Sequence, residues 1–116
     1  MGRVLVLEPY EGIRAVIETV VRLLGHEPVV AALAGSREEL GPLDAVVVEP
    51  AAPAARTLLE ALLDENPTLP VVCVSIEPEG AELPVEPVAY LVKPFGVPHL
   101  SAALERALAG GSAKPS

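Results

Sequence analysis

Four polar side chains end apolar segments of this chain, where functional groups are expected. Glu8, Glu49 and Ser75 each close a run rich in valine, and Lys93 closes a fourth apolar run. Each residue alone could simply be the polar end of a strand. Two neighbouring carboxylates repel each other unless a cation lies between them. The cation available at these ends is Lys93, so we expect an ion pair between Lys93 and Glu49, with Ser75 as a further hydrogen-bond donor.

The positions of these side chains follow from the segments that carry them. Val46–Val48 is an unbroken β-branched run, typical of a strand buried on both faces of a parallel sheet. Functional groups in such sheets collect beyond the carboxyl ends of the strands. The pattern predicts an α/β domain with strands at 3–8, 28–33, 43–49, 70–76 and 88–92, and helices around 13–24, 58–65 and 97–109.

Helical periodicity and prolines define the rest of the chain. The first helix carries an apolar stripe that we expect to face the core: Ile13, Val16, Ile17, Val20, Val21 and Leu24. Residues 77–87 contain Pro78, Pro84 and Pro87, and proline is strongly unfavourable inside a helix. We therefore expect no helix longer than about one turn in this segment.

Composition limits the classes of function. The 116 residues carry a net charge of −8, which argues against binding to nucleic acid or to an anionic membrane by charge. No apolar run could cross a membrane, so we expect a cytoplasmic protein. The lone cysteine, Cys73, lies in an apolar run and is expected to be a small buried side chain. We expect one domain over 1–109 and a flexible tail over 110–116.

Over nearly its whole length the chain resembles the receiver domains of two-component response regulators. The most specific match is Tyr90-Leu-Val-Lys93-Pro94-Phe95 at the end of the fifth strand. Three further segments match: Val4-Leu-Val-Leu-Glu8, Asp44-Ala-Val-Val-Val-Glu49 and Pro70-Val-Val-Cys-Val-Ser75. The resemblance implies a flavodoxin-like three-layer sandwich with strand order 2-1-3-4-5, in which the fourth helix is degenerate or missing here. It also implies a cis peptide bond between Lys93 and Pro94.

The resemblance also shows where the phosphotransfer site departs from the family. Two acids hold Mg²⁺ in such receivers, but here Glu8 is followed by Pro9, which has no side-chain oxygen. The phospho-accepting aspartate is replaced by Glu49, which is one methylene longer. Ser75 and Lys93 match the phosphate-contacting positions, and Tyr90 matches the switch tyrosine. Without an intact phosphorylation site, we interpret Tyr90 as ordinary strand packing with its hydroxyl at the surface.

These departures predict a receiver domain that has lost its phosphotransfer activity. We expect no enzymatic activity, no cofactor and no bound magnesium, and a protein partner in a phosphorelay-type signalling pathway. The sequence also allows a homodimer. Glu49 either mimics a phosphorylated aspartate or is an inert relic. The alternatives are a response regulator with residual phosphoryl acceptance at Glu49 or Glu8, and a flavodoxin-like domain that binds a small molecule.

Overall fold

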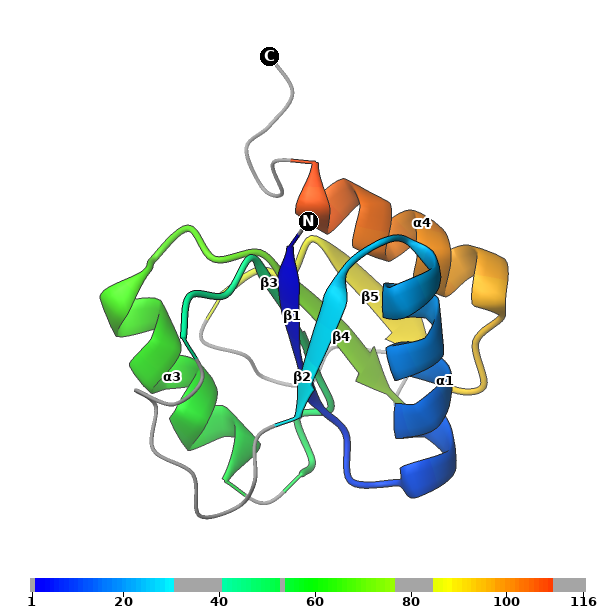
Figure 1. Cartoon of the computed structure of the whole chain (residues 1–116). Coiled ribbons are helices and arrows are strands. Elements are labelled where there is room, and N and C mark those ends of the chain that lie inside the picture. Colours follow the sequence, from blue (N-terminus) through cyan, green and yellow to red (C-terminus); the bar gives the residue numbers. More distant parts are fainter. Residues whose placement is uncertain (1, 31–40, 53, 77–84, 110–116) are drawn as a thin grey trace.

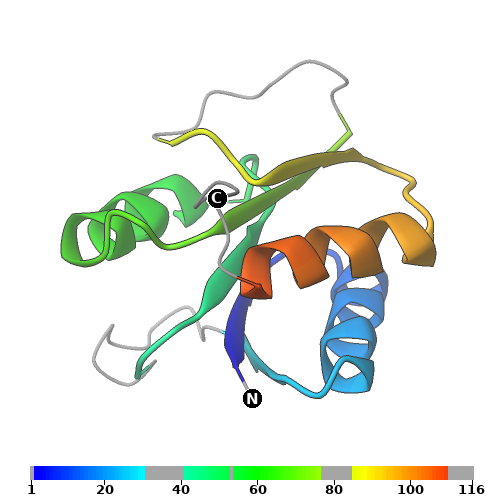
Figure 2. The same cartoon turned by 90° about the horizontal axis from the view of Figure 1, so that it is seen from above.

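The computed structural model describes residues 2–30, 41–52, 54–76 and 85–109. Five parallel strands form one sheet in the order β2-β1-β3-β4-β5, which is the order predicted. Helix α3 covers one face of the sheet, while α1 and α4 lie together on the other (Figures 1 and 2). The elements are β1 (Arg3–Leu7), α1 (Glu11–Leu23), β2 (Glu27–Val30), β3 (Ala45–Val48), α3 (Ala55–Glu65), β4 (Val71–Ser75), β5 (Ala89–Val92) and α4 (Val97–Leu108).

The central strands bury both of their faces, as their continuous apolar sequences predict. Leu5 of β1 pairs with Val46 of β3, and Val47 pairs with Val72 of β4. All four residues of β3 are fully buried. Because every strand is parallel, all five carboxyl ends lie at one edge of the sheet, where α1 begins (Figure 1).

Each face of the sheet has its own apolar core. On one side, Val4, Val6 and Val47 of the sheet pack with α1 and α4, whose buried residues include Ile17 and Leu104. On the other side, Leu5, Val46 and Val48 pack against α3 through a smaller set of side chains: Ala55, Leu59 and Leu62. Alternation along each strand therefore divides the side chains between two helical layers.

Helix boundaries agree with their sequence signals. Gly25 follows α1 with a φ of 89°, a conformation that suits glycine at a helix end. Asn66 closes α3, and Pro98 lies in the first turn of α4, where its missing N–H costs nothing. The prediction for the α1 stripe is wrong at Val16, which is exposed, because the sheet and α4 cover a narrower strip of α1 than the apolar sequence spans.

Some predictions fall partly or wholly on residues that the structure does not describe. Within 77–87 only residues 85–87 are described, and they are not helical. The described ranges contain three helices, consistent with a missing fourth receiver helix. The second strand begins at Glu27, and residues 31–33 of the predicted strand lie outside the described chain, as do Pro53 and the predicted tail at 110–116. No helix in the described ranges is long and apolar enough to span a bilayer.

Candidate functional site

Two buried glutamates lie side by side at the carboxyl edge of the sheet. Glu8 directly follows β1 and Glu49 directly follows β3. The two strands are hydrogen-bonded neighbours, and the Glu49 N–H donates to the Leu7 carbonyl at 2.9 Å. Each glutamate is only 4% exposed. The strand pairing thus brings together two acids that are 41 positions apart in the sequence.

Lys93 reaches both acids from the end of β5. Its Nζ lies 2.6 Å from Glu49 Oε1 and 2.9 Å from Glu8 Oε1. The Lys93 side chain is 5% exposed, so this charged contact is almost sealed from water. The predicted pairing of Lys93 with Glu49 is confirmed, and the same ammonium also forms an ion pair with Glu8. A buried lysine requires such partners because an isolated buried charge is very costly.

The remaining carboxylate oxygens are held by backbone amides. Glu8 Oε2 accepts a 3.1 Å hydrogen bond from the Tyr10 N–H, and Glu49 Oε2 accepts one of 3.0 Å from the Ala51 N–H. Glu49 therefore has both oxygens in directed hydrogen bonds. Glu8 Oε1 accepts no directed hydrogen bond from the described residues, and its contact with Lys93 is an ion pair.

Burial and charge act in opposite directions on Lys93. Burial disfavours the ammonium, but the contacts with Glu49 and then Glu8 favour it more strongly, so the pKa of Lys93 is raised above its ordinary value of 10.5. The charges of the same site also affect the pKa of Cys73 on β4. Its burial, followed by the negative charge of Glu49, raises the pKa of this thiol to about 12, against a smaller opposite effect of Lys93. Cys73 is thus a buried neutral thiol, as predicted.

The other predicted site residues lie around this ion-paired centre. Ser75 is buried at the end of β4, and its carbonyl accepts a 2.7 Å hydrogen bond from the Lys93 N–H. Tyr90 is half-buried on β5, opposite Cys73 of β4. Pro9 is exposed between Glu8 and α1. The peptide bond between Lys93 and Pro94 is cis, as the resemblance implies. The roles assigned to Ser75 and Tyr90 stay predictions.

Two residues of the site were not singled out from the sequence. The Tyr10 ring centroid lies 5.3 Å from Lys93 Nζ, within the range of a cation–π contact. Arg14 of α1 donates from Nη1 to the Glu8 carbonyl at 3.3 Å. The one indication in the sequence that Tyr10 and Arg14 belong to the site is that both lie within six residues of Glu8.

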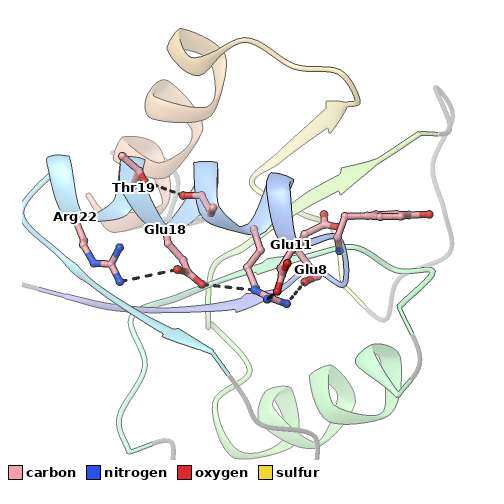
Figure 3. Close-up of polar contacts among 8 residues, drawn as sticks. Glu8, Glu11, Glu18, Thr19 and Arg22 are labelled. Atoms are coloured by element: carbon pink, nitrogen blue, oxygen red, sulfur yellow. Dashed lines mark hydrogen bonds and ion pairs between the residues drawn. The ribbon is translucent and has the colours of Figure 1, made fainter.

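A row of ion pairs runs along α1 (Figure 3), and Arg14 belongs to it. Arg14 contacts Glu18 at 3.7 Å and Glu11 at 3.9 Å, while Arg22 contacts Glu18 at 3.9 Å. The spacings of three and four residues place these side chains on one helical face. This row ties the first turn of α1 to the strand end that carries Glu8.

Receiver domains imply a magnesium ion at this edge, and the residues here do not fit one. Mg²⁺ needs near-octahedral oxygen ligands, usually with one or two carboxylates. Pro9 provides no oxygen from its side chain, and the two available carboxylates are bridged by the Lys93 ammonium. No cluster of three or more acidic, histidine or cysteine ligands occurs among the residues that the structure describes. A divalent cation would have to displace Lys93.

Comparison with known proteins identifies a matching family and several similar structures. The family model described as "Flagellar regulatory protein FleQ" matches residues 3–109. No curated protein matches the chain. Among solved structures, the PhyR receiver domain of Erythrobacter litoralis is 21% identical, with a TM-score of 0.77 over 99% of this chain and 95% of that one. The response regulator CheY4 of Vibrio cholerae is 22% identical, with a TM-score of 0.74 over 93% and 99%.

A longer protein contains the same fold. NtrX from Brucella abortus, solved in complex with ADP, is 24% identical with a TM-score of 0.73. The match covers 93% of this chain but 26% of NtrX, so the chain spans about a quarter of that protein. These likenesses show that the fold is the receiver fold of response regulators.

Proposed function

The chain belongs to the FleQ family of flagellar regulatory proteins, and from this premise we propose that it is a pseudo-receiver, a regulatory module that binds a protein partner without being phosphorylated. Its receiver fold supports a role in response-regulator signalling. The observation that carries the proposal is the Lys93 ammonium, which bridges Glu49 and Glu8 at 2.6 and 2.9 Å. In this proposal the module has no enzymatic activity and acts in the cytoplasm.

The state of Glu49 supports the absence of phosphoryl transfer. A carboxylate that attacks a phosphoryl group needs a free lone pair aligned with that group. Glu49 Oε1 is bound by the Lys93 ammonium and Oε2 by the Ala51 N–H. Each bound oxygen keeps one further lone pair, whose direction is fixed by these charge-assisted bonds in a buried site. In addition, the glutamate side chain is one methylene longer, so its carboxylate lies further from the backbone than the carboxylate of an aspartate would.

The charge balance supports the same proposal. Phosphoryl transfer depends on cations that neutralise the developing negative charge. Here the Lys93 ammonium already faces two carboxylates, and the three groups together contribute a formal charge of −1. The pseudo-receiver is thus held in one electrostatic state. A module in a single state can present a constant surface to its partner.

Intact-protein mass spectrometry tests this proposal. The chain is incubated with acetyl phosphate in the presence of Mg²⁺, and separately with EDTA. We expect no gain of a phosphoryl group in either sample. A magnesium-dependent gain of one phosphoryl group would refute the pseudo-receiver and favour a working response regulator. A receiver domain with its aspartates intact, treated in parallel, controls for the donor.

A further inference from the structure

The amino edge of the sheet, opposite the ion-paired centre, contains a histidine that holds the start of the first strand (Figure 1). The Gly2 N–H donates a 2.7 Å hydrogen bond to Nδ1 of His26, a residue 24 positions later. The Gly2 carbonyl accepts a 2.8 Å hydrogen bond from the Glu27 N–H. Both polar groups of the Gly2 backbone are therefore held by the two residues at the entry to β2. We call this pair of hydrogen bonds the amino-edge clasp.

The clasp lies in a crowded part of the molecule. Gly2 is buried, and a β-carbon at this position would lie 3.2 Å from Asp44 Oδ2 and 3.2 Å from Leu108 Cδ2. Asp44 directly precedes β3, and Leu108 is the last residue of α4. The His26 N–H donates to the Val21 carbonyl at 3.0 Å, which ties the histidine to the end of α1. The clasp thus lies where the starts of three strands meet the ends of two helices.

The hydrogen bond from Gly2 requires one protonation state of His26. A neutral imidazole has one nitrogen that donates and one that accepts, and the contact with Gly2 makes Nδ1 the acceptor. The ring proton is then on Nε2. A protonated imidazole donates from both nitrogens, so its Nδ1–H would face the Gly2 N–H and the hydrogen bond would be lost. Protonation of His26 and closure of the clasp are therefore mutually exclusive.

The charged side chains of the neighbouring strands do not keep His26 neutral. Glu27 forms an ion pair with Arg3, at 3.5 Å between Oε1 and Nε. Asp44 Oδ2 accepts a 2.8 Å hydrogen bond from the Arg3 N–H. A carboxylate near an imidazole favours the protonated ring, so these two acids do not oppose protonation of His26.

The helix ends beside His26 do not oppose protonation either. The carbonyl end of α1 favours a nearby cation. Arg22, in the last turn of α1, pairs with Glu18 at 3.9 Å, which offsets its charge. From α4, the residue that faces Gly2 is the apolar Leu108. Among the residues that the structure describes, the hydrogen bond from Gly2 is therefore the contact that opposes protonation of His26.

We propose that the amino-edge clasp is an acid-sensitive switch, which is closed while His26 is neutral and opens when His26 takes up a proton. Histidine is the side chain that ordinarily changes charge between about pH 5 and about pH 8, so the switch operates in that range. On opening, the start of β1 separates from the entry to β2. The inference goes beyond the proposed function and does not depend on it, because the clasp and the ion-paired centre lie at opposite edges of the sheet.

Nitrogen-15 NMR of the imidazole ring tests the closed state in the wild-type chain. At about pH 8 we expect Nδ1 of His26 to have the chemical shift of an unprotonated nitrogen and Nε2 that of a protonated one. The opposite tautomer would overturn the inference, because a protonated Nδ1 cannot accept a hydrogen bond from Gly2.

Hydrogen exchange at the Glu27 amide, which donates to the Gly2 carbonyl, measures the opening of the clasp. In the wild type, the protection factor should fall about tenfold between about pH 8 and about pH 5, as expected for the loss of one hydrogen bond. His26→Asn places an amide oxygen near the position of Nδ1 and does not titrate in this range, so its protection should change by less than about twofold.

His99→Asn is the matched control for this experiment. It makes the same substitution at the other histidine of the chain, which is exposed in the first turn of α4, and it should keep the wild-type fall in protection. Constant protection in the wild type would overturn the clasp, as would an equal fall in the wild type and His26→Asn, which would assign the acid response to other groups. If His26→Asn alters folding, the imidazole spectrum of the wild type still decides. A phosphoryl gain in the mass experiment would remove the pseudo-receiver and leave this inference intact.

Discussion

Lys93 donates a 2.6 Å hydrogen bond from Nζ to Oε1 of Glu49, a residue 44 positions earlier in the chain. Both side chains are 5% exposed. Receiver domains use the corresponding residues to accept and bind a phosphoryl group. In this chain the same two positions form a buried ion pair with each other.

Removal of the Lys93 charge should destabilise the fold. Lys93→Met keeps most of the apolar stem but leaves Glu8 and Glu49 facing each other without a cation. We expect the free energy of unfolding in urea at pH 7 to fall by roughly 3–5 kcal/mol, as for other buried pairs that lose one partner. The double variant Lys93→Met with Glu49→Gln is the control and should recover part of the loss. Equal stabilities of the wild type and the single variant would show that the pair contributes nothing.

The stability contributed by Lys93 should disappear at alkaline pH. Its folded-state pKa is raised above 10.5, so the folded chain holds this proton more tightly than the unfolded chain. The contribution is therefore fully present below the unfolded pKa and is lost as pH rises through the folded pKa. Urea unfolding of the wild type and of Lys93→Met from pH 8 to pH 11.5 measures it. The difference between the two should be constant at first and shrink above about pH 10.5. A constant difference over the whole range would contradict this account.

Restoration of the missing acids should restore metal binding. Glu49→Asp alone should bind Mg²⁺ poorly, because position 9 still provides no carboxylate. Glu49→Asp combined with Pro9→Asp should give measurable Mg²⁺ binding by calorimetry and phosphorylation by acetyl phosphate. Pro9→Ala with Glu49→Asp controls for loss of the proline ring. If the single variant is phosphorylated as readily as the combined one, the role given to Pro9 is wrong.

Cys73 should resist thiol reagents in the folded protein. It is fully buried and its pKa is about 12, so at pH 8 only about one molecule in ten thousand carries a thiolate. We expect iodoacetamide to label the denatured chain within minutes and the native chain at least about a hundredfold more slowly. Intact mass over time follows the reaction. Rapid native labelling, at a rate independent of urea, would place Cys73 at the surface instead.

The parallel strands and the composition of the site follow from local patterns in the sequence, and the order of the strands was implied by the resemblance to receiver domains. Continuous apolar runs specify buried parallel strands, and parallel strands place their carboxyl ends at one edge. Glu49 and Lys93 each end such a run, so their meeting was predictable from residue types alone. The fold that positions them needed no information beyond periodicity, prolines and the resemblance to receivers.

Tertiary structure alone decided how the site is enclosed. Val16 belongs to a regular apolar stripe, yet it lines an open pocket, because the exposure of a helical residue depends on which neighbouring elements cover it. Nothing in the sequence around Tyr10 indicated that its ring would lie 5.3 Å from the Lys93 ammonium. The sequence places residues on the face of an element. Which faces remain open is determined by how the helices pack across the sheet, and this packing depends on side chains far apart in the chain.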